Sequence, residues 1–312
     1  MASIDIQPLD ENLTFGAQVT GVTRDLLTDD TVREELQGLF RKCGVIVFRN
    51  VEQTPEMQVA ISTVFGPLKD HPVPTVDRAD AEKLLGVIAI SNNPGACIVE
   101  IDGKPLVTWQ PWHFDHAYNN ELNYAGVLRS IITATDGGDT AFADGIQIYG
   151  DMDPAIREKA EGISLLLNLD LRYGKQRFGL PKGFRVIKEH ENSMSAQNEN
   201  GRCAVHPAVW TRETGEKVFH MTPYGCRGIL GDRSDAAFEL CQEIWDEAMR
   251  VNKPYVHKWE DGDMVIWDNH RVLHEATGCN PDNERLVHRT TIKGDYGYGR
   301  WEDEPARESE TA

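Results

Sequence analysis

Residues 261–278, "DGDMVIWDNHRVLHEATG", carry an acidic turn, a short apolar strand and two histidines in close succession. From about residue 85 onward the chain repeats such short apolar segments between turns, among them "GVIAI", "AGVLRSIITA" and "RLVHRTTIKG". Turn residues such as the DG of "EIDGKPL" and the GGD of "TDGGDTAF" separate the segments. Many short strands joined by turns are typical of a β-sandwich or a jelly roll, and we predict a core of this kind.

The first third of the chain has a mixed α/β pattern. Residues 28–44 and 54–66 place apolar side chains at helical spacing between capping residues, and "VIVFRN" between them predicts a short strand. Two later segments, 153–162 and 234–250, predict helices that interrupt the strands. Residues 189–202 are polar throughout, which predicts a mobile loop.

Charge and composition narrow the possible partners. The chain has 312 residues, with 32 Lys and Arg against 50 Asp and Glu, and a net charge of −18. A surface this acidic repels phosphate backbones and anionic lipids, so we expect neither nucleic acid nor membrane as a partner. The N-terminus lacks the pattern of a secretory signal, and no apolar run reaches the ~18 residues that would span a bilayer. Six scattered cysteines without a CxxC pair favour reduced thiols in a cytoplasmic protein.

A candidate metal site begins in "WHFDH", where one residue separates His113 from Asp115. In an extended strand alternate side chains leave the same face, so the imidazole and the carboxylate would point at one spot. Alone, an H-x-D pair is a weak signal and more often represents a surface pair or a histidine hydrogen-bonded to a carboxylate. A third ligand can come from His270 or His274 in "WDNHRVLH", because facing sheets bring residues remote in sequence together.

Two imidazoles and one carboxylate on one face of an octahedral ion leave three adjacent positions open. This arrangement suits iron(II) that binds a chelating cosubstrate and dioxygen together, although zinc hydrolases use the same ligand types. In "NERLVHRTTIKGD", Arg285 and Arg289 lie on one face if the segment is a strand. Buried guanidiniums need anionic partners, and carboxylates of small molecules are gripped bidentately by arginine. The alternative is that both arginines face solvent or pair with the abundant Asp and Glu.

Several blocks extend the pattern over nearly the whole chain: "PLDENLTFGAQVTGV", "GVIVFRN", "FGPLKDHP", "WHFD", "GGDTAFAD", "HPAVWTRETGEKVF", "WDNHRVLH" and "RLVHRTTIKGD". In this order they resemble the taurine dioxygenase-like family of iron(II)/2-oxoglutarate-dependent oxygenases. The resemblance implies an α+β fold with a mainly β core, a double-stranded β-helix (jelly roll) with flanking helices. It also implies Fe(II), 2-oxoglutarate as cosubstrate and O2.

Residue by residue, the resemblance assigns the site. His113, Asp115 and His274 match the iron ligands, with His274 rather than His270 as the third. Arg285 and Thr140 match the residues that hold the distal carboxylate of 2-oxoglutarate. Arg289 matches an arginine that binds the substrate anion, and His71 falls near the substrate end of the pocket. For the remaining histidines that we considered, the resemblance assigns no role, and we expect structural positions: His116, His270 and His288.

The chain also departs from the taurine enzyme. The stretch between His71 and His113 is longer and puts Trp109 where that enzyme has a polar asparagine. Such a segment often forms a lid, and a tryptophan there favours a larger or more apolar substrate than taurine. The alternative is that Trp109 packs in a small core of the lid itself. Since halogenating relatives replace the carboxylate ligand by a small residue, the presence of Asp115 disfavours halogenation.

Taken together, the resemblance implies a dioxygenase that oxidises a C–H bond of a small anionic substrate and releases succinate and CO2. Hydroxylation followed by C–S or C–O cleavage fits the same ligands. We considered two alternatives, a metal-dependent cupin-type hydrolase or isomerase without a keto acid, and a non-catalytic binding protein. We expect a homo-oligomer, a dimer or tetramer, and one oxygenase domain over 1–312. Its parts are a mixed N-terminal part (1–84), a lid (85–112), a jelly-roll core (113–300) and a frayed tail (301–312).

Overall fold

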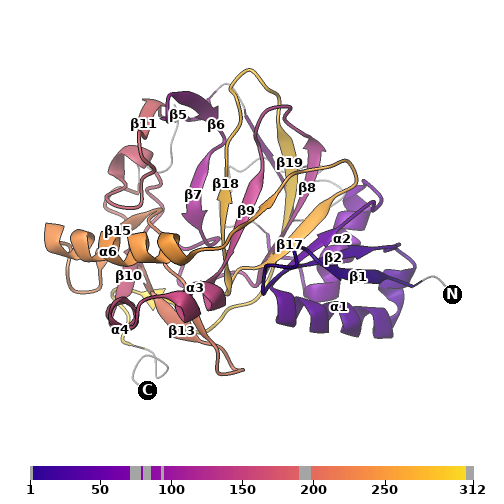
Figure 1. Ribbon diagram of the computed structural model, residues 1–312, viewed down its shortest axis with the longest axis horizontal. Helices are drawn as coiled ribbons and strands as arrows, with labels where there is room; N and C mark the ends of the chain where they lie inside the picture. The colour runs from indigo at the N-terminus through magenta and orange to yellow at the C-terminus, as the bar shows by residue number, and fades with distance from the viewer. Residues whose placement is uncertain (1–2, 71–78, 80–85, 93–94, 190–197, 307–312) are drawn as a thin grey trace.

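The computed structural model describes residues 3–70, 79, 86–92, 95–189 and 198–306 of the chain. Most of its regular structure is β-strand, and the longer helices lie on the outside of the sheets (Figure 1). The prediction of a mainly β protein with few helices is therefore confirmed. Within the described residues, no helix has the length and apolar character needed to cross a membrane. All six cysteines are free thiols.

The larger sheet has seven strands and combines the N-terminal part with the rest of the chain. Its strands in spatial order are β1 (Asp5–Pro8), β2 (Ala17–Thr20), β3 (Val45–Phe48), β17 (Met264–Asp268), β8 (Ala125–Ile132), β19 (Leu286–Ile292) and β4 (Val87–Ser91). Neighbours pair antiparallel except β2 and β3, which are parallel. Strand β17 pairs with β8 over its full length and with β3 over Met264–Trp267, and it lies at the centre of the sheet.

A four-stranded sheet faces the larger one. Its order is β16 (Tyr255–His257), β9 (Thr140–Asp144), β18 (Val272–Ala276) and β7 (Gln110–His113). One buried apolar cluster contains Val265 and Trp267 of the larger sheet together with Phe142 and Val272 of the smaller, so the two sheets share a core. Within the larger sheet Gly126 of β8 stands opposite Trp267 of β17, and an added Cβ at Gly126 would lie 2.4 Å from the Trp267 ring.

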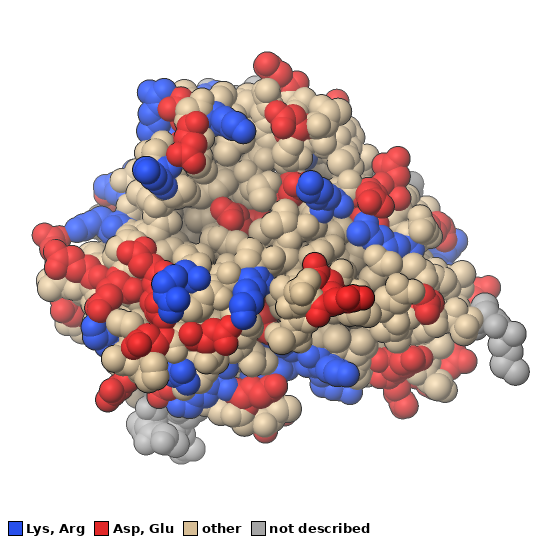
Figure 2. Space-filling view, in the orientation of Figure 1, with Lys and Arg blue, Asp and Glu red and all other residues tan. Residues whose placement is uncertain are grey.

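The helices follow the predicted capping residues. Helix α1 (Asp30–Cys43) ends at Gly44, whose φ of 73° is the left-handed conformation that glycine tolerates. Helix α2 (Pro55–Phe65) begins after Thr54, whose hydroxyl accepts the Met57 amide hydrogen. The apolar faces of both helices pack on the larger sheet. The other helices are α4 (Pro154–Glu161), α6 (Asp235–Val251) and α3 (Gly145–Asp151), of which α3 was not predicted from the sequence. The 3-10 turns lie at Leu26–Thr28 and Tyr173–Lys175. Asp and Glu side chains gather over α6 on the face shown in Figure 2.

Three smaller sheets complete the fold. They are β15 (Cys226–Ile229), β10 (Ser164–Leu167), β12 (Ala204–Pro207) and β20 (Arg300–Trp301); β11 (Arg185–Lys188), β5 (Ile98–Ile101) and β6 (Lys104–Val107); and β13 (Val209–Thr211) with β14 (Lys217–Phe219). The predicted DG turn joins β5 to β6, with positive φ at both Asp102 and Gly103.

Two predicted boundaries need correction. Strand β4 falls inside the predicted lid, 85–112, but belongs to the larger sheet, because its backbone pairs with β19 along its length. The tail does not begin to fray at Trp301 or Glu302. Trp301 pairs with β12, the Glu302 amide donates to the Cys203 carbonyl, and Arg233 lies 2.7 Å from the Glu302 carboxylate. Most of the predicted mobile loop, residues 190–197, lies outside the described residues.

Candidate metal centre

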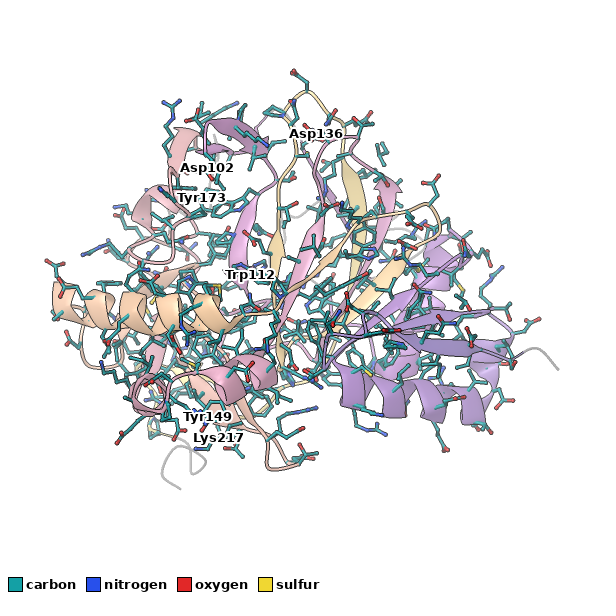
Figure 3. The ribbon with its side chains drawn as sticks, viewed as in Figure 1. Asp102, Trp112, Asp136, Tyr149, Tyr173 and Lys217 are labelled. Atoms are coloured by element: carbon teal, nitrogen blue, oxygen red, sulfur yellow. The ribbon has the colours of Figure 1, made fainter. Side chains whose placement is uncertain are left out.

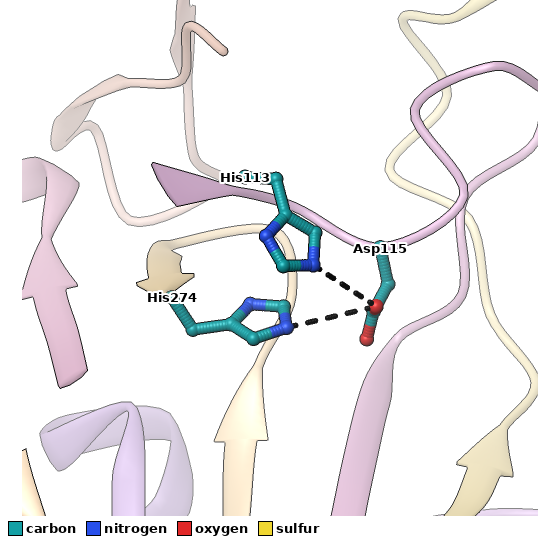
Figure 4. Close-up of side chains that lie close together, drawn as sticks. All are labelled: His113, Asp115 and His274. Atoms are coloured by element: carbon teal, nitrogen blue, oxygen red, sulfur yellow. Dashed lines mark ion pairs between the residues drawn. The ribbon is translucent and has the colours of Figure 1, made fainter. Parts of the chain in front are cut away.

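Three side chains from the two predicted motifs meet inside the molecule. One ligand atom each from His113, Asp115 and His274 lies within 4.8 Å of the other two, and all three residues are buried. Oδ1 of Asp115 is 3.9 Å from Nε2 of His113 and 3.6 Å from Nε2 of His274 (Figure 4). Among the described residues this is the one group of His, Cys, Asp and Glu with such a geometry.

Strand pairing explains how the two histidines meet. His113 on β7 stands directly opposite His274 on β18 in an antiparallel pair. Side chains opposite one another in such a pair start about 5 Å apart, and the two ring centroids lie 4.1 Å apart. The assignment of His274 rather than His270 to this cluster agrees with the geometry, since His270 lies in the turn before β18.

The position of Asp115 differs from the sequence argument. Strand β7 ends at His113, so Asp115 lies in the turn that follows and not on an alternate position of a strand. Its side chain still reaches the cluster, but strand alternation is not the cause. The turn is sharp, because the next residue, His116, has a φ of 58°.

The protonation of the cluster suits a metal ion. Nδ1 of His113 lies 2.7 Å from the Pro111 carbonyl oxygen, which can only accept, so Nδ1 carries the proton and Nε2 presents a lone pair. Burial lowers the pKa of both His113 and His274, which keeps the rings neutral. Burial is the largest single influence on Asp115 and opposes its ionisation, but the Arg289 guanidinium and the neighbouring histidines together offset it and hold the pKa of that carboxyl well below its usual range. Neutral imidazoles and an ionised carboxylate are the forms that bind metals.

Arg289 pairs with the cluster itself. Its two terminal nitrogens lie 2.8 Å from Oδ1 and 2.6 Å from Oδ2 of Asp115, and the guanidinium carbon is 5.8 Å from the centroid of the Trp267 ring. The pairing with an acidic residue of the protein, one of the alternatives considered from sequence, is the arrangement that this structure shows. Asp115 is therefore shared between the two histidines and Arg289.

Arg285, four residues earlier and just before β19, has no such carboxylate partner among the residues that the structure describes. It is 4% exposed, and its Nε donates to the Gly138 carbonyl oxygen at 3.3 Å. No carboxylate of the described residues lies within 4.0 Å of its guanidinium. The glycine turn of "GGDT" packs against this side chain, because an added Cβ at Gly138 would lie 3.2 Å from the Arg285 side chain. A buried guanidinium without a counter-ion is costly, so this position fits an anionic ligand.

Thr140 and Trp109 occupy different surroundings. Thr140 is 2% exposed at the start of β9, two residues after Gly138, and its hydroxyl accepts the indole hydrogen of Trp259 at 3.2 Å. Trp109 is buried in a small cluster beside the β5–β6 hairpin. Its indole nitrogen donates to Glu275 at 3.1 Å, and Glu275 leaves β18 on the face opposite to its neighbour His274.

Two tyrosines lie between Trp109 and the metal cluster. The ring of Trp109 is 5.2 Å from Tyr173, Tyr173 is 5.7 Å from Tyr224, and Tyr224 is 5.8 Å from His113. Tyr173 is labelled in Figure 3, below the turn that carries Asp102. Trp109 also lines a cavity of about 260 Å³ between α6 and the outer face of β18. These contacts are those expected if Trp109 packs within a small core of the predicted lid, 85–112. His71, the other residue expected near the substrate, lies outside the described residues.

Two residues beside the cluster were not found from the sequence. The ring of Trp267 lies 4.7 Å from His274, so it forms part of the wall behind the ligands. Its position on β17, alternating with Val265 toward the shared core, is a signal that could have identified it. Asn269 contacts the backbone of Asp115, and no periodicity in the sequence marks it.

Comparison with known proteins identifies related sequences over nearly the whole chain. The model of the family "Taurine catabolism dioxygenase TauD, TfdA family" matches residues 5–291. The chain is 29% identical to an (S)-phenoxypropionate/alpha-ketoglutarate-dioxygenase of Sphingobium herbicidovorans, over 94% of this chain and 96% of the relative. It is 25% identical to an alkylsulfatase of Acinetobacter baylyi, over 91% of this chain and 84% of the relative.

Solved structures share the fold. The crystal structure of AAD-2 in complex with Mn(II) and N-oxalylglycine superimposes with a TM-score of 0.71 at 20% identity, covering 94% of this chain and 98% of that one. A putative alpha-ketoglutarate-dependent taurine dioxygenase from Burkholderia xenovorans superimposes with a TM-score of 0.69 at 23% identity, covering 94% and 93%. The chain therefore belongs to the TauD/TfdA family of dioxygenases, which use Fe(II), 2-oxoglutarate and O2.

Proposed function

We propose that this dioxygenase oxidises a C–H bond of a small organic anion, with His113, Asp115 and His274 as the ligands of its iron(II). The donor set fits the ion, because two neutral imidazoles and one ionised carboxylate converge from one side. We also propose that the two facing sheets form a double-stranded β-helix. In that fold His113 and His274 project from paired strands into the space between the sheets.

The observation that carries the proposal is the buried guanidinium of Arg285, which has no carboxylate partner among the described residues. This residue is 4% exposed, and its Nε donates to the Gly138 carbonyl oxygen. The distal carboxylate of 2-oxoglutarate would supply the missing counter-ion through a bidentate pair. The hydroxyl of Thr140, on the strand that follows the Gly138 turn, would donate to the same carboxylate while accepting from Trp259.

The chain's own residues position the cosubstrate and the substrate. When bound, iron(II) with the keto acid and dioxygen supplies an oxidation of a C–H bond, with succinate and CO2 as coproducts. Arg285 and Thr140 would hold the distal carboxylate of the keto acid, and His113, Asp115 and His274 would hold the metal ion. Trp267 and Tyr224 exclude water from the histidines. Which C–H bond reacts depends on how the substrate is held.

Arg289 is the proposed anchor for the substrate anion. In the structure it holds Asp115 through two nitrogens, and a metal ion on Asp115 would take part of that negative charge. The guanidinium would then have capacity for an additional anion. Relatives named for phenoxypropionate, alkyl sulfates and sulfate esters support an aryloxy acid or a sulfate ester as the substrate class. We further propose that the β5–β6 hairpin covers the site as a lid.

Two measurements test the function. Anaerobic addition of iron(II) and 2-oxoglutarate should give a weak visible charge-transfer band, which a cupin-type hydrolase would not give. Succinate release should then be screened with aryloxy acids, sulfate esters, sulfonates and amino-acid derivatives. Stimulation of succinate release above the uncoupled rate by a member of this panel supports the proposal. The absence of both the band and keto-acid consumption would overturn it.

A further inference from the structure

The backbone of Asp115 lies outside any strand pairing. Strand β7 ends at His113, and the following residues up to Tyr124 cross over to β8 in the other sheet. His116 adopts a left-handed φ of 58°, which is uncommon for a residue other than glycine. A regular ladder therefore does not fix the direction in which the Asp115 carboxylate points, and another group must fix it.

The side chain of Asn269 contacts both polar groups of that backbone. Its Oδ1 accepts the Asp115 amide hydrogen at 2.6 Å, and its Nδ2 donates to the Asp115 carbonyl oxygen at 3.1 Å. The same Nδ2 donates to the carbonyl oxygen of Asn123 at 3.0 Å. Only a carboxamide offers one acceptor and two donor hydrogens on a single planar group.

Asn269 is itself rigidly held. It is 0% exposed, its amide donates to the Tyr124 carbonyl oxygen at 2.9 Å, and its own carbonyl accepts from Nε2 of His220 at 3.0 Å. It lies in the turn between β17 and β18, and β18 carries His274. One carboxamide thus connects the crossover that bears Asp115 to the turn that leads into His274.

We propose that Asn269 is a positioning residue for the metal site. It fixes the backbone of Asp115, so that the carboxylate meets His113 and His274 at the spacing a metal ion requires. The role differs from that of Arg289, which contacts the carboxylate oxygens and leaves the Asp115 backbone free. This inference rests on the proposed function, since it concerns the same metal site.

The test is metal binding by the metal-free protein, with Mn(II) as the probe and titration calorimetry as the readout. Asn269→Ala should raise the Kd for Mn(II) by about 10- to 100-fold, the range seen when groups that orient ligands are removed. Hydrogen exchange at the Asp115 amide in the metal-free protein should become faster. Asn269→Asp keeps the acceptor but loses both donors, and it should weaken Mn(II) binding as well. Asn269→Asp takes the place of Asn269→Ala in the Mn(II) titration if the alanine variant does not fold.

The matched control is Asn168→Ala. Asn168 is also buried (2% exposed), and its side chain likewise accepts a backbone amide hydrogen, from Asp170 at 3.1 Å, and donates to a carbonyl, of Asn198 at 3.1 Å. It should leave Mn(II) affinity within about two-fold of the wild type, because it orients no ligand. Wild-type affinity in both Asn269 variants would overturn the positioning role alone. A wild type that binds no Mn(II) would instead overturn the proposed metal site, and the positioning role with it.

Discussion

Arg285, just before strand β19, and Arg289, in the middle of that strand, are in opposite electrostatic situations. Arg289 is 9% exposed and pairs through two nitrogens with Asp115, whereas Arg285 is 4% exposed and bonds to a backbone carbonyl. Both guanidiniums are buried, so the difference lies in their partners. At Arg289 the protein supplies the counter-ion, and at Arg285 we expect the cosubstrate to supply it. A buried charge left open is the feature that points to a ligand.

The largest effect should come from removing the ion pair between Arg289 and Asp115. Asp115→Ala removes a proposed ligand and leaves Arg289 as bare as Arg285. Succinate formation and Mn(II) binding should fall by more than about 100-fold, and the unfolding free energy of the metal-free protein should fall by about 3 kcal/mol. His113→Ala should abolish the same activity. Succinate assays, calorimetry and urea unfolding measure the three effects.

His270→Ala is the control for the ligand assignment. His270 is buried in the turn before β18, and no metal role is expected for it. Metal binding and succinate formation should persist in this variant. Loss of the metal site with His270→Ala, and its survival with His274→Ala, would show that the third ligand is wrongly assigned.

Replacing Arg285 should change the stability of the metal-free protein in the opposite direction. Arg285→Met removes the bare cation, so the metal-free protein should be as stable as the wild type or more stable. The KM for 2-oxoglutarate should rise by about 100-fold, because the bidentate anchor is lost. Arg285→Lys keeps the charge without the planar fork and should raise the KM by about 10-fold. An unchanged KM in both variants would contradict the role of Arg285.

Replacing Arg289 should affect the substrate more than the cosubstrate. Arg289→Ala should raise the concentration of organic anion needed for half-maximal activity by about 10- to 100-fold, while uncoupled turnover of 2-oxoglutarate continues. Steady-state assays with and without the substrate separate the two effects. If the substrate response is unchanged, the arginine serves only to hold Asp115.

A smaller effect is expected for a second buried carboxylate, Asp268. Burial raises its pKa to about 6, since Arg212, at 3.7 Å, offsets burial only in part. The unfolded chain has an ordinary pKa of about 3.9, so between about pH 4 and 6 the folded state binds more protons. The unfolding free energy should therefore fall as pH rises through this window, by less than about 3 kcal/mol, the value that corresponds to a pKa difference of about two units. Asp268→Asn should remove this slope in urea unfolding at a series of pH values, and an unaltered slope would assign it to other groups.

The smallest effect is expected for a substitution at Trp109, which is neither a charged residue nor a proposed metal ligand. Trp109→Phe removes the indole hydrogen bond to Glu275 but keeps a ring in the aromatic cluster. Stability should fall by about 1 kcal/mol, and Mn(II) affinity should not change. A change in which substrates are accepted would show that Trp109 also contacts the substrate, as the resemblance first implied.

Much of the fold follows from local signals in the sequence. Helix α1 ends at Gly44 because that glycine takes a left-handed φ, and α2 begins where Thr54 caps its first turn. The β5–β6 hairpin turns at Asp102 and Gly103 for the same conformational reason. The pairing of the C-terminal strand β20 was not predictable, because its partner strand β12 lies almost a hundred residues earlier in the chain.

For the site, the sequence by itself determined which residue types were available and that His113, Asp115 and His274 were the candidates. Only the tertiary structure decided how they meet. His113 faces His274 through strand register, while Asp115 lies past the end of its strand, in contact with Asn269 from a distant turn. The tertiary structure also decided that Arg289 pairs with the Asp115 carboxylate, whereas Arg285 donates to the Gly138 carbonyl oxygen. The physical reason is that counter-ions and backbone partners of buried groups come from segments far away in the chain, which periodicity and capping do not record.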